Sequence, residues 1–240
     1  MYDFGNIRDI KVQEPESWTK KMFITIDIDW CCDEILKYCI DLIEENDICA
    51  TWFITHETSL LQRLRENPHF EIGIHPNYNP LLKGNFQYGS NSRTVIKHFM
   101  DIVPEAVSVR SHSLTQSSSF YNDYQDLGLK FDCNEFMPFY SGICLKPYTL
   151  WNTNIIRVPY FWEDDVVCQL AYTKIEETFS TTGLKIYDFH PIHIFLNSEN
   201  LHRYEQTRHL HHKPDELSLY KNDGVGIRTQ LLRLLSLAHR

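Results

Sequence analysis

Apolar residues in this chain gather into seven short runs that are separated by longer stretches with helical spacing. The short runs are rich in β-branched and aromatic residues, which is typical of buried strands. Predicted strands cover residues 22–29, 48–54, 70–74, 107–109, 129–133, 155–159 and 184–189. Predicted helices cover residues 33–45, 57–67, 93–102, 117–127 and 165–179. The first helix has one apolar stripe, made of Ile35, Leu36, Cys39, Ile40 and Ile43.

Strands that alternate with helices predict a parallel sheet joined by crossover helices. The strands are nearly continuous in apolar residues, as expected where helices cover the sheet. We therefore expect an α/β fold in one domain over residues 1–240, with a polar lead-in over 1–20 and a terminal helix over 225–240. A barrel and an open doubly wound sheet both fit the pattern. No GxGxxG or Walker-type loop follows the first strand, which disfavours nucleotide binding of those types.

Three polar segments interrupt the alternation of strands and helices. They cover residues 77–92, 135–154 and 197–223. The third contains His209, His211 and His212, a cluster that solvated side chains would explain. Because long connections without secondary structure are usually functional, we expect the second and third segments to shape specificity.

Composition and charge limit the kinds of partner that this protein is expected to bind. The 240 residues have a formal net charge of −9 and a pI of about 5.7, which argues against general binding to nucleic acid. No apolar stretch approaches the roughly 20 residues that span a bilayer. The first residues lack the basic start and apolar centre of a signal peptide. With an odd count of seven cysteines and no CxxC pair, we expect a soluble cytoplasmic protein with reduced thiols.

Side chains that bind metals or move protons stand at the ends of four predicted strands. They are Asp27 and Asp29 at the first strand, His75 at the third, Arg110 and His112 at the fourth, and His190 and His193 at the last. A barrel gathers the C-terminal ends of its parallel strands on one face, so these groups are expected to meet there.

Each of these groups also has a simpler explanation. Asp27 and Asp29 share one side of a strand and repel each other unless a cation compensates, but a helix cap and a solvated carboxylate would explain them too. Arg110 could pair with Asp27 and keep it ionised, or form a salt bridge without a catalytic role. A strand-end histidine is a ligand, a general acid or a hydrogen-bonded core residue.

Taken in order, these runs resemble the polysaccharide deacetylase family, the NodB-like carbohydrate esterases. TIDID at residues 25–29 stands where the family has Thr-Phe-Asp-Asp-Gly, and ATWF at 50–53 matches its Ala-Thr-Phe-Phe strand. EIGIH at 71–75 matches Glu-Ile-Gly-x-His, RSH at 110–112 corresponds to Arg-x-Pro, and YDFH at 187–190 to the strand with a catalytic His. The resemblance covers residues 22 to about 196 and is nearest to deacetylase-like proteins of surface-polysaccharide (O-antigen) gene clusters.

The resemblance implies a distorted (β/α)7 barrel with a divalent metal, zinc in the first place, that removes acetyl groups from N-acetylated sugars. On the matching positions, Asp27 would be the base, Arg110 would orient it, and His190 would be the acid. Asp29 and His75 would bind the metal. We also expect Tyr78, Trp162 and His193 to contact the sugar.

The chain departs from the family pattern at two positions. The second metal-binding His of the family is Asn79 here, and the Pro of its Arg motif is His112. Either the Asn79 amide or the His112 imidazole could complete the metal site, although an amide is the poorer zinc ligand. A site completed by neither would be weak in metal or inactive.

Three functions fit these residues. The first is a metal-dependent hydrolase that removes an N-acetyl or related N-acyl group from an amino sugar in surface-polysaccharide biosynthesis. The second is a non-catalytic carbohydrate-binding or regulatory protein on a degenerate barrel, which Asn79 favours and the intact Asp27, Arg110 and His190 oppose. The third is a different metal-dependent amidohydrolase on the same scaffold, acting on a cyclic amide or a formamido sugar.

Overall fold

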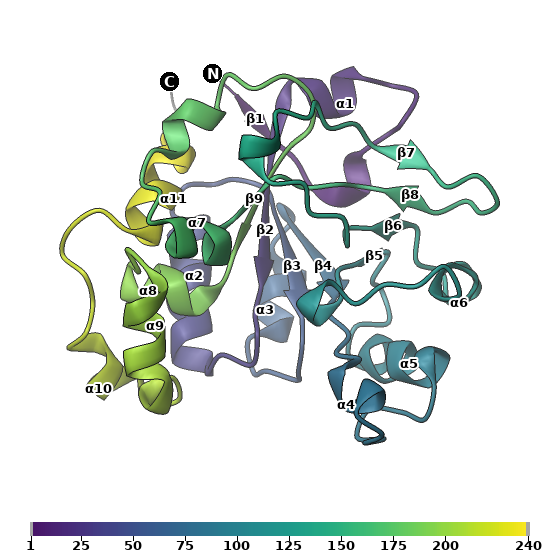
Figure 1. The fold of residues 1–240 in the computed structure, drawn as a ribbon, viewed down its shortest axis with the longest axis horizontal. Coiled ribbons are helices and arrows are strands. Elements are labelled where there is room, and N and C mark those ends of the chain that lie inside the picture. The colour runs from purple at the N-terminus through teal and green to yellow at the C-terminus, as the bar shows by residue number, and fades with distance from the viewer. Residues whose placement is uncertain (1, 239–240) are drawn as a thin grey trace.

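The computed structural model describes residues 2–238, which form an α/β fold around one curled sheet (Figure 1). The strands are β1 (Asp3–Phe4), β2 (Lys21–Asp27), β3 (Ala50–Ile54), β4 (Phe70–Ile74), β5 (Ser108–Val109), β6 (Phe131–Asp132), β7 (Tyr148–Thr149), β8 (Ile156–Arg157), β9 (Trp162–Glu163) and β10 (Lys185–Phe189). They lie in the order β7-β8-β6-β5-β4-β3-β2-β10-β9, and β1 pairs with the start of β2. Of the described strand pairs, all are parallel except β7 with β8.

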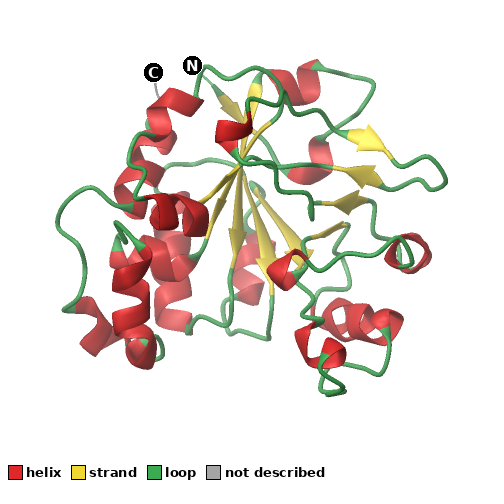
Figure 2. Cartoon of the chain, in the orientation of Figure 1, coloured by secondary structure: helices red, strands yellow, loops and turns green. Residues whose placement is uncertain are grey.

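Helices flank the sheet on both sides, as Figure 2 shows. They are α1 (Glu16–Thr19), α2 (Asp33–Glu44), α3 (Leu61–Glu66), α4 (Asn79–Leu82), α5 (Ser92–Ile102), α6 (Phe120–Asp126), α7 (Asp164–Leu170), α8 (Pro191–Leu196), α9 (Leu201–Thr207), α10 (Pro214–Ser218) and α11 (Ile227–Leu235). Helix α8 packs against both α2 and α11, and α5 packs against α6 (Figure 1).

The seven predicted strands correspond to β2, β3, β4, β5, β6, β8 and β10. These seven are neighbours in one parallel array, curled into a partial barrel whose path ends at β7 and β9. The predicted α/β fold with a distorted (β/α)7 barrel is therefore confirmed, and the doubly wound alternative is not needed. The predicted stripe on α2 is confirmed too, since its five apolar residues are buried.

Several local predictions are corrected by the structure. The lead-in is part of the core, because β1 joins the sheet and Ile7, Ile10 and Trp18 are buried. The helix predicted over 165–179 ends at Leu170, because Ala171 takes the left-handed conformation, with φ of 48°. The polar segment 197–223 contains α9 and α10. Residue 1 of the lead-in and residues 239 and 240 of the terminal helix lie outside the described residues.

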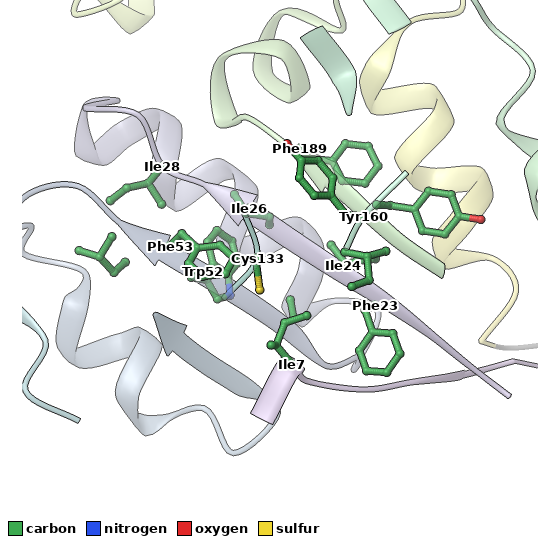
Figure 3. Packing of buried hydrophobic residues seen from close by; sticks show 14 of the residues in the cluster. Ile7, Phe23, Ile24, Ile26, Ile28, Trp52, Phe53, Cys133, Tyr160 and Phe189 are labelled. Atoms are coloured by element: carbon green, nitrogen blue, oxygen red, sulfur yellow. The ribbon is translucent and has the colours of Figure 1, made fainter. Parts of the chain in front are cut away.

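The core lies where the middle strands meet the helices (Figure 3). Phe23, Ile24 and Ile26 of β2 are buried beside Trp52 and Phe53 of β3. The parallel register of the sheet places the ends of these strands side by side. Strands β2, β4, β5 and β10 run parallel and end at one edge, so the residues that follow them lie on one face of the molecule.

Candidate metal and catalytic site

Three side chains from three strand ends form a compact cluster of possible metal ligands. They are Asp29 after β2, His75 after β4 and His112 after β5. The Asp29 Oδ1 atom lies 3.3 Å from His75 Nε2 and 3.3 Å from His112 Nδ1. One ligand atom from each residue lies within 4.8 Å of the other two. A carboxylate and two imidazoles on three fixed strand ends can hold one divalent cation.

The backbone that presents Asp29 is strained. Asp29 has φ of 36° and Trp30 has φ of 53°, both in the left-handed region. A non-glycine residue held in such a region costs on the order of 1–3 kcal/mol, so the surroundings must enforce it. The Trp30 amide donates to Thr55 Oγ1 at 3.0 Å, and the Trp30 ring packs edge-on against His112 with centroids 5.0 Å apart. Strain of this kind is typical of residues that serve a site.

The atoms of the cluster fit zinc. Within residues 2–238, Asp29 Oδ1 and His75 Nδ1 are buried without a hydrogen-bond partner, which a bound cation would remedy for the oxygen. Burial would raise the pKa of Asp29, but the neighbouring His112 and His75 rings hold it well below its usual value. Asp29 is therefore a carboxylate, the form that ligates metals.

Asn79 lies apart from this cluster. Its side-chain nitrogen donates to Ser113 Oγ at 3.1 Å, and it lines neither cavity beside the cluster. Of the two residues considered for completing the metal site, the structure brings His112 to Asp29 and His75 and leaves Asn79 outside.

Arg110 links Asp27 to a second buried acid. The guanidinium is fully buried, and its Nη1 donates to Asp27 Oδ1 at 3.0 Å and to Thr25 Oγ1 at 2.9 Å. The same nitrogen donates to Asp188, and Nε donates to the carbonyl oxygen of Cys133 at 3.3 Å. The predicted pairing of Arg110 with Asp27 is present, and both side chains are buried, where such bonds are strong.

Asp188 is the residue of this group that sequence reasoning missed. It is 1% exposed and accepts a hydrogen bond from Thr25 Oγ1 at 2.7 Å. Burial raises the pKa of Asp188 well above its usual value, with Arg110 opposing and Asp27 adding to the increase. A signal existed: Asp188 stands two residues before His190, so both belong to the same side of the strand, as Asp27 and Asp29 do.

His190 is held by Asp164 at the start of α7. The His190 amide donates to Asp164 Oδ2 and its Nδ1 to Asp164 Oδ1, each at 2.6 Å. Burial opposes the charged imidazole, but Asp164, Asp165 and Asp29 raise the pKa of His190 well above its usual value. With Nδ1 bound to Asp164, Nε2 points toward the cluster and lies 3.8 Å from Asp29 Oδ2. His190 can therefore present a proton at Nε2.

Two connected hollows open over these residues. The smaller has a volume of about 130 Å³ and is lined by Asp27, Asp29, His75, Ser111, His112, Ser113, Leu114, Tyr160, Glu163, Asp165 and His190. The larger has a volume of about 350 Å³ and shares Asp29, His112, Asp165 and His190 with the smaller one. Its remaining wall comes from Trp30, Cys31, Ile192, His193, Tyr204, Arg208, His211 and His212. A small ligand can reach both the candidate metal cluster and His190.

The three residues predicted to contact the sugar lie in different surroundings. His193 lines the larger cavity, with Nε2 2.7 Å from Asp165 Oδ1. Tyr78 is 1% exposed and stacks on Phe120, and Trp162 is fully buried against Phe189. Sugar contact by Tyr78 and Trp162 does not hold in the structure, because packing encloses both rings.

The histidine cluster of the third polar segment is also corrected. His211 and His212 line the larger cavity, together with Tyr204 and Arg208. His211 is half-buried, which together with its neighbours lowers its pKa to about 4. His209 and His212 are exposed, as solvated side chains are, whereas His211 is half-buried, and His211 and His212 belong to one wall of the cavity.

Comparisons with known proteins identify related chains. Residues 24–208 match the model of the WbmS-like polysaccharide deacetylase family. A crystal structure from Bordetella bronchiseptica, of a protein assigned as a polysaccharide deacetylase involved in O-antigen biosynthesis, shares 44% identity over 98% of each chain, with a TM-score of 0.91.

Two other solved structures are only weakly similar. A 4-alpha-glucanotransferase from Thermococcus litoralis is 10% identical over 85% of this chain and 39% of its own, with a TM-score of 0.49. A protein from Mycobacterium smegmatis assigned as a polysaccharide deacetylase is 11% identical over 96% of this chain and 93% of its own, also with a TM-score of 0.49. At this level of similarity, neither structure supports a statement about the function of this chain.

No curated protein matches the chain significantly. Within residues 2–238, no helix has the length and apolar character needed to cross a bilayer. The family model covers most of the chain, and the Bordetella structure matches it from end to end in both sequence and fold. The chain belongs to the WbmS-like polysaccharide deacetylase family.

Proposed function

We propose that this protein is a metal-dependent hydrolase that removes an N-acetyl group from an amino sugar during the biosynthesis of a surface polysaccharide such as O-antigen. The observation that carries the proposal is the position of His112, which supplies the second imidazole beside Asp29 and His75. The description of the Bordetella protein supports the place in O-antigen biosynthesis. A complete set of ligands next to a base and an acid favours catalysis over a binding role.

Asp29, His75 and His112 would hold the metal, and zinc suits one carboxylate with two imidazoles. When bound there, the metal would polarise the acyl carbonyl and lower the pKa of a water molecule. Asp29 and His112 line both cavities and His75 lines the smaller one, so a metal held by them would be reachable from the cavities. Tyr160 and Leu114 also line the smaller cavity and give it an apolar side suited to a short acyl group.

Asp27 would act as the base. Arg110 holds one of its oxygens at 3.0 Å, and the other lies 3.5 Å from His75 Nδ1. Asp27 lines the smaller cavity beside Asp29, so it can accept a proton from a water molecule placed between them. The fixed guanidinium keeps the carboxylate in one orientation during the transfer.

His190 would act as the acid. Asp164 binds its Nδ1, so the exchangeable proton is on Nε2, which faces the cavities. From there His190 can protonate the nitrogen of the sugar as the carbon–nitrogen bond breaks. The raised pKa of His190 supplies the protonated form at neutral pH.

A matched pair of variants tests the metal site. For the purified protein, elemental analysis should find about one zinc per chain, and incubation with N-acetylated amino sugars should release acetate. His112→Ala should lose both the metal and the activity, because three ligands fall to two. Asn79→Ala should keep both, because within residues 2–238 the Asn79 side chain hydrogen-bonds to Ser113 and to none of the three ligands. Loss of metal in Asn79→Ala with retention in His112→Ala would reverse the assignment.

A further inference from the structure

The wall of the larger cavity that faces the candidate metal cluster consists of Tyr204, Arg208, His211 and His212. The cavity volume of about 350 Å³ is near the lower end of small-molecule sites, which span roughly 300–1,000 Å³. A space of this size accepts a single sugar unit with its substituents rather than a long stretch of polymer. The groups on this wall therefore face the same sugar unit whose acyl group lies at the metal cluster.

The position of this wall is fixed by packing. The Tyr204 ring lies between the rings of His193 and His211, with centroids 5.1 Å and 4.7 Å away. The backbone oxygen of His211 lies 3.9 Å from Cys32 Sγ, which ties the wall to the start of α2. Arg208 lies between Tyr204 and His211 in the chain, so its backbone is held at the cavity by contacts on both sides.

The Arg208 guanidinium is available to a ligand. Its nearest acid in the described chain is Glu205, at 3.9 Å, and both side chains are mostly exposed, so this pair contributes little. No hydrogen bond of the Arg208 side chain is present within residues 2–238. Arg203 on α9 differs, because Glu199 and the Tyr220 carbonyl oxygen occupy its donors. A guanidinium with open donors at a cavity is suited to carboxylate or phosphate oxygens.

We propose that Arg208, with His212 beside it, binds an anionic group on the substrate, so that the preferred substrate is an N-acylated sugar carrying a carboxylate or a phosphate. The reaction assumed here rests on the proposed function, whereas the anion site rests on the residues that line this wall of the cavity. An uncharged amino sugar would leave the Arg208 donors to solvent. The acidic side chains at the cavity each lie against imidazoles, Asp29 against His75 and His112 and Asp165 against His193.

Isothermal titration of the zinc-loaded protein with three probes tests the anion site. The probes are N-acetylglucosamine, 2-acetamido-2-deoxyglucuronic acid and N-acetylglucosamine 1-phosphate. We expect one charged probe to bind more tightly than the neutral sugar, and the better of the two identifies carboxylate or phosphate. Arg208→Gln should weaken the charged probe by roughly 10- to 100-fold and change the neutral one little, because a charge-assisted hydrogen bond is lost.

Two further variants serve as controls. Lys213→Gln removes a positive charge from the same segment at an exposed residue outside the cavity and should change no probe. Arg208→Lys keeps the charge without the fork and should fall between wild type and Arg208→Gln. The proposal is wrong if neither charged probe binds better than the neutral sugar, or if Arg208→Gln weakens all probes equally. Binding that depends on Arg208 without acetate release would instead count against the proposed function.

Discussion

Buried acid–base groups lie at both ends of β4, but their bonding partners differ. At its start, Glu71 is 1% exposed, and one of its oxygens accepts hydrogen bonds from the Arg8 amide at 2.8 Å and from Thr51 Oγ1 at 3.0 Å. Burial raises the pKa of Glu71. Past its end, His75 stands between Asp27 and Asp29, and the pKa of Asp29 is lowered.

The comparison separates a structural acid from functional ones. Thr51 Oγ1 also accepts the Ile7 amide at 3.2 Å, so Glu71 helps hold the lead-in against the sheet with uncharged donors. The groups after the strand combine strained backbone and adjacent cavities. Burial is common to both ends, so the character of each acid is set by its partners. The predictions below change one end at a time.

The largest effect is expected from Asp27→Asn at the functional end. Asparagine can still accept the hydrogen bond from Arg110, but it cannot take a proton. We expect the rate constant kcat for acetate release to fall about 10²- to 10⁴-fold, the usual contribution of a general base. Metal content should stay that of the wild type, because Asp29, His75 and His112 are unchanged. Turnover within a few-fold of wild type would remove Asp27 from the mechanism.

A smaller effect is expected from Asp188→Asn, which lies behind the base. Asp188 does not line either cavity, so it acts through Arg110 as a positioning residue. Asparagine keeps the size and one acceptor but replaces the second carboxyl oxygen with an amide nitrogen, which changes how Arg110 is shared with Asp27. We expect kcat to fall roughly tenfold, as for other outer partners of an active site, with KM unchanged. An increase in KM at constant kcat would instead indicate contact with substrate.

The fold was predictable because its main signals are local. The seven predicted strands and the α2 stripe are patterns within a few residues, and the structure contains them. Strands β1, β7 and β9 have two residues each and were not predicted, whereas β5, β6 and β8 are as short but lie within longer apolar runs. Tyr78 and Trp162 are enclosed by contacts with Phe120 and Phe189, which no local pattern reveals.

The site was predictable in part. The predicted strand ends pointed to Asp29, His75 and His112, because the C-terminal residues of parallel strands lie at one edge of the sheet. Asp188 was missed because its partner Arg110 is 78 residues away, and its position two residues before His190 was the one local signal for it. The wall around Arg208 was missed for the same reason, since the contact of His211 with Cys32 spans 179 residues. Such pairings depend on the packed fold and are absent from any short window of sequence.

The smallest effect is expected from Glu71→Gln at the structural end. An acid whose folded pKa is raised contributes most to stability below the ordinary glutamate pKa of about 4.3, and this contribution is lost as pH rises through the folded pKa. Glutamine imitates the protonated form and can accept the same two hydrogen bonds. The free energy of unfolding of Glu71→Gln should therefore exceed that of wild type at pH 7 by on the order of 1 kcal/mol.

Chemical denaturation at several pH values measures this difference. The difference between Glu71→Gln and wild type should grow from about pH 4 upward and become constant above the folded pKa. The exposed Glu57 provides the control, and Glu57→Gln should show no such trend. Because the substitution lies at the opposite end of β4 from the cavities, acetate release should be unchanged. A less stable Glu71→Gln at pH 7 would mean that the carboxylate is bound in its charged form, and the two ends of β4 would then be alike.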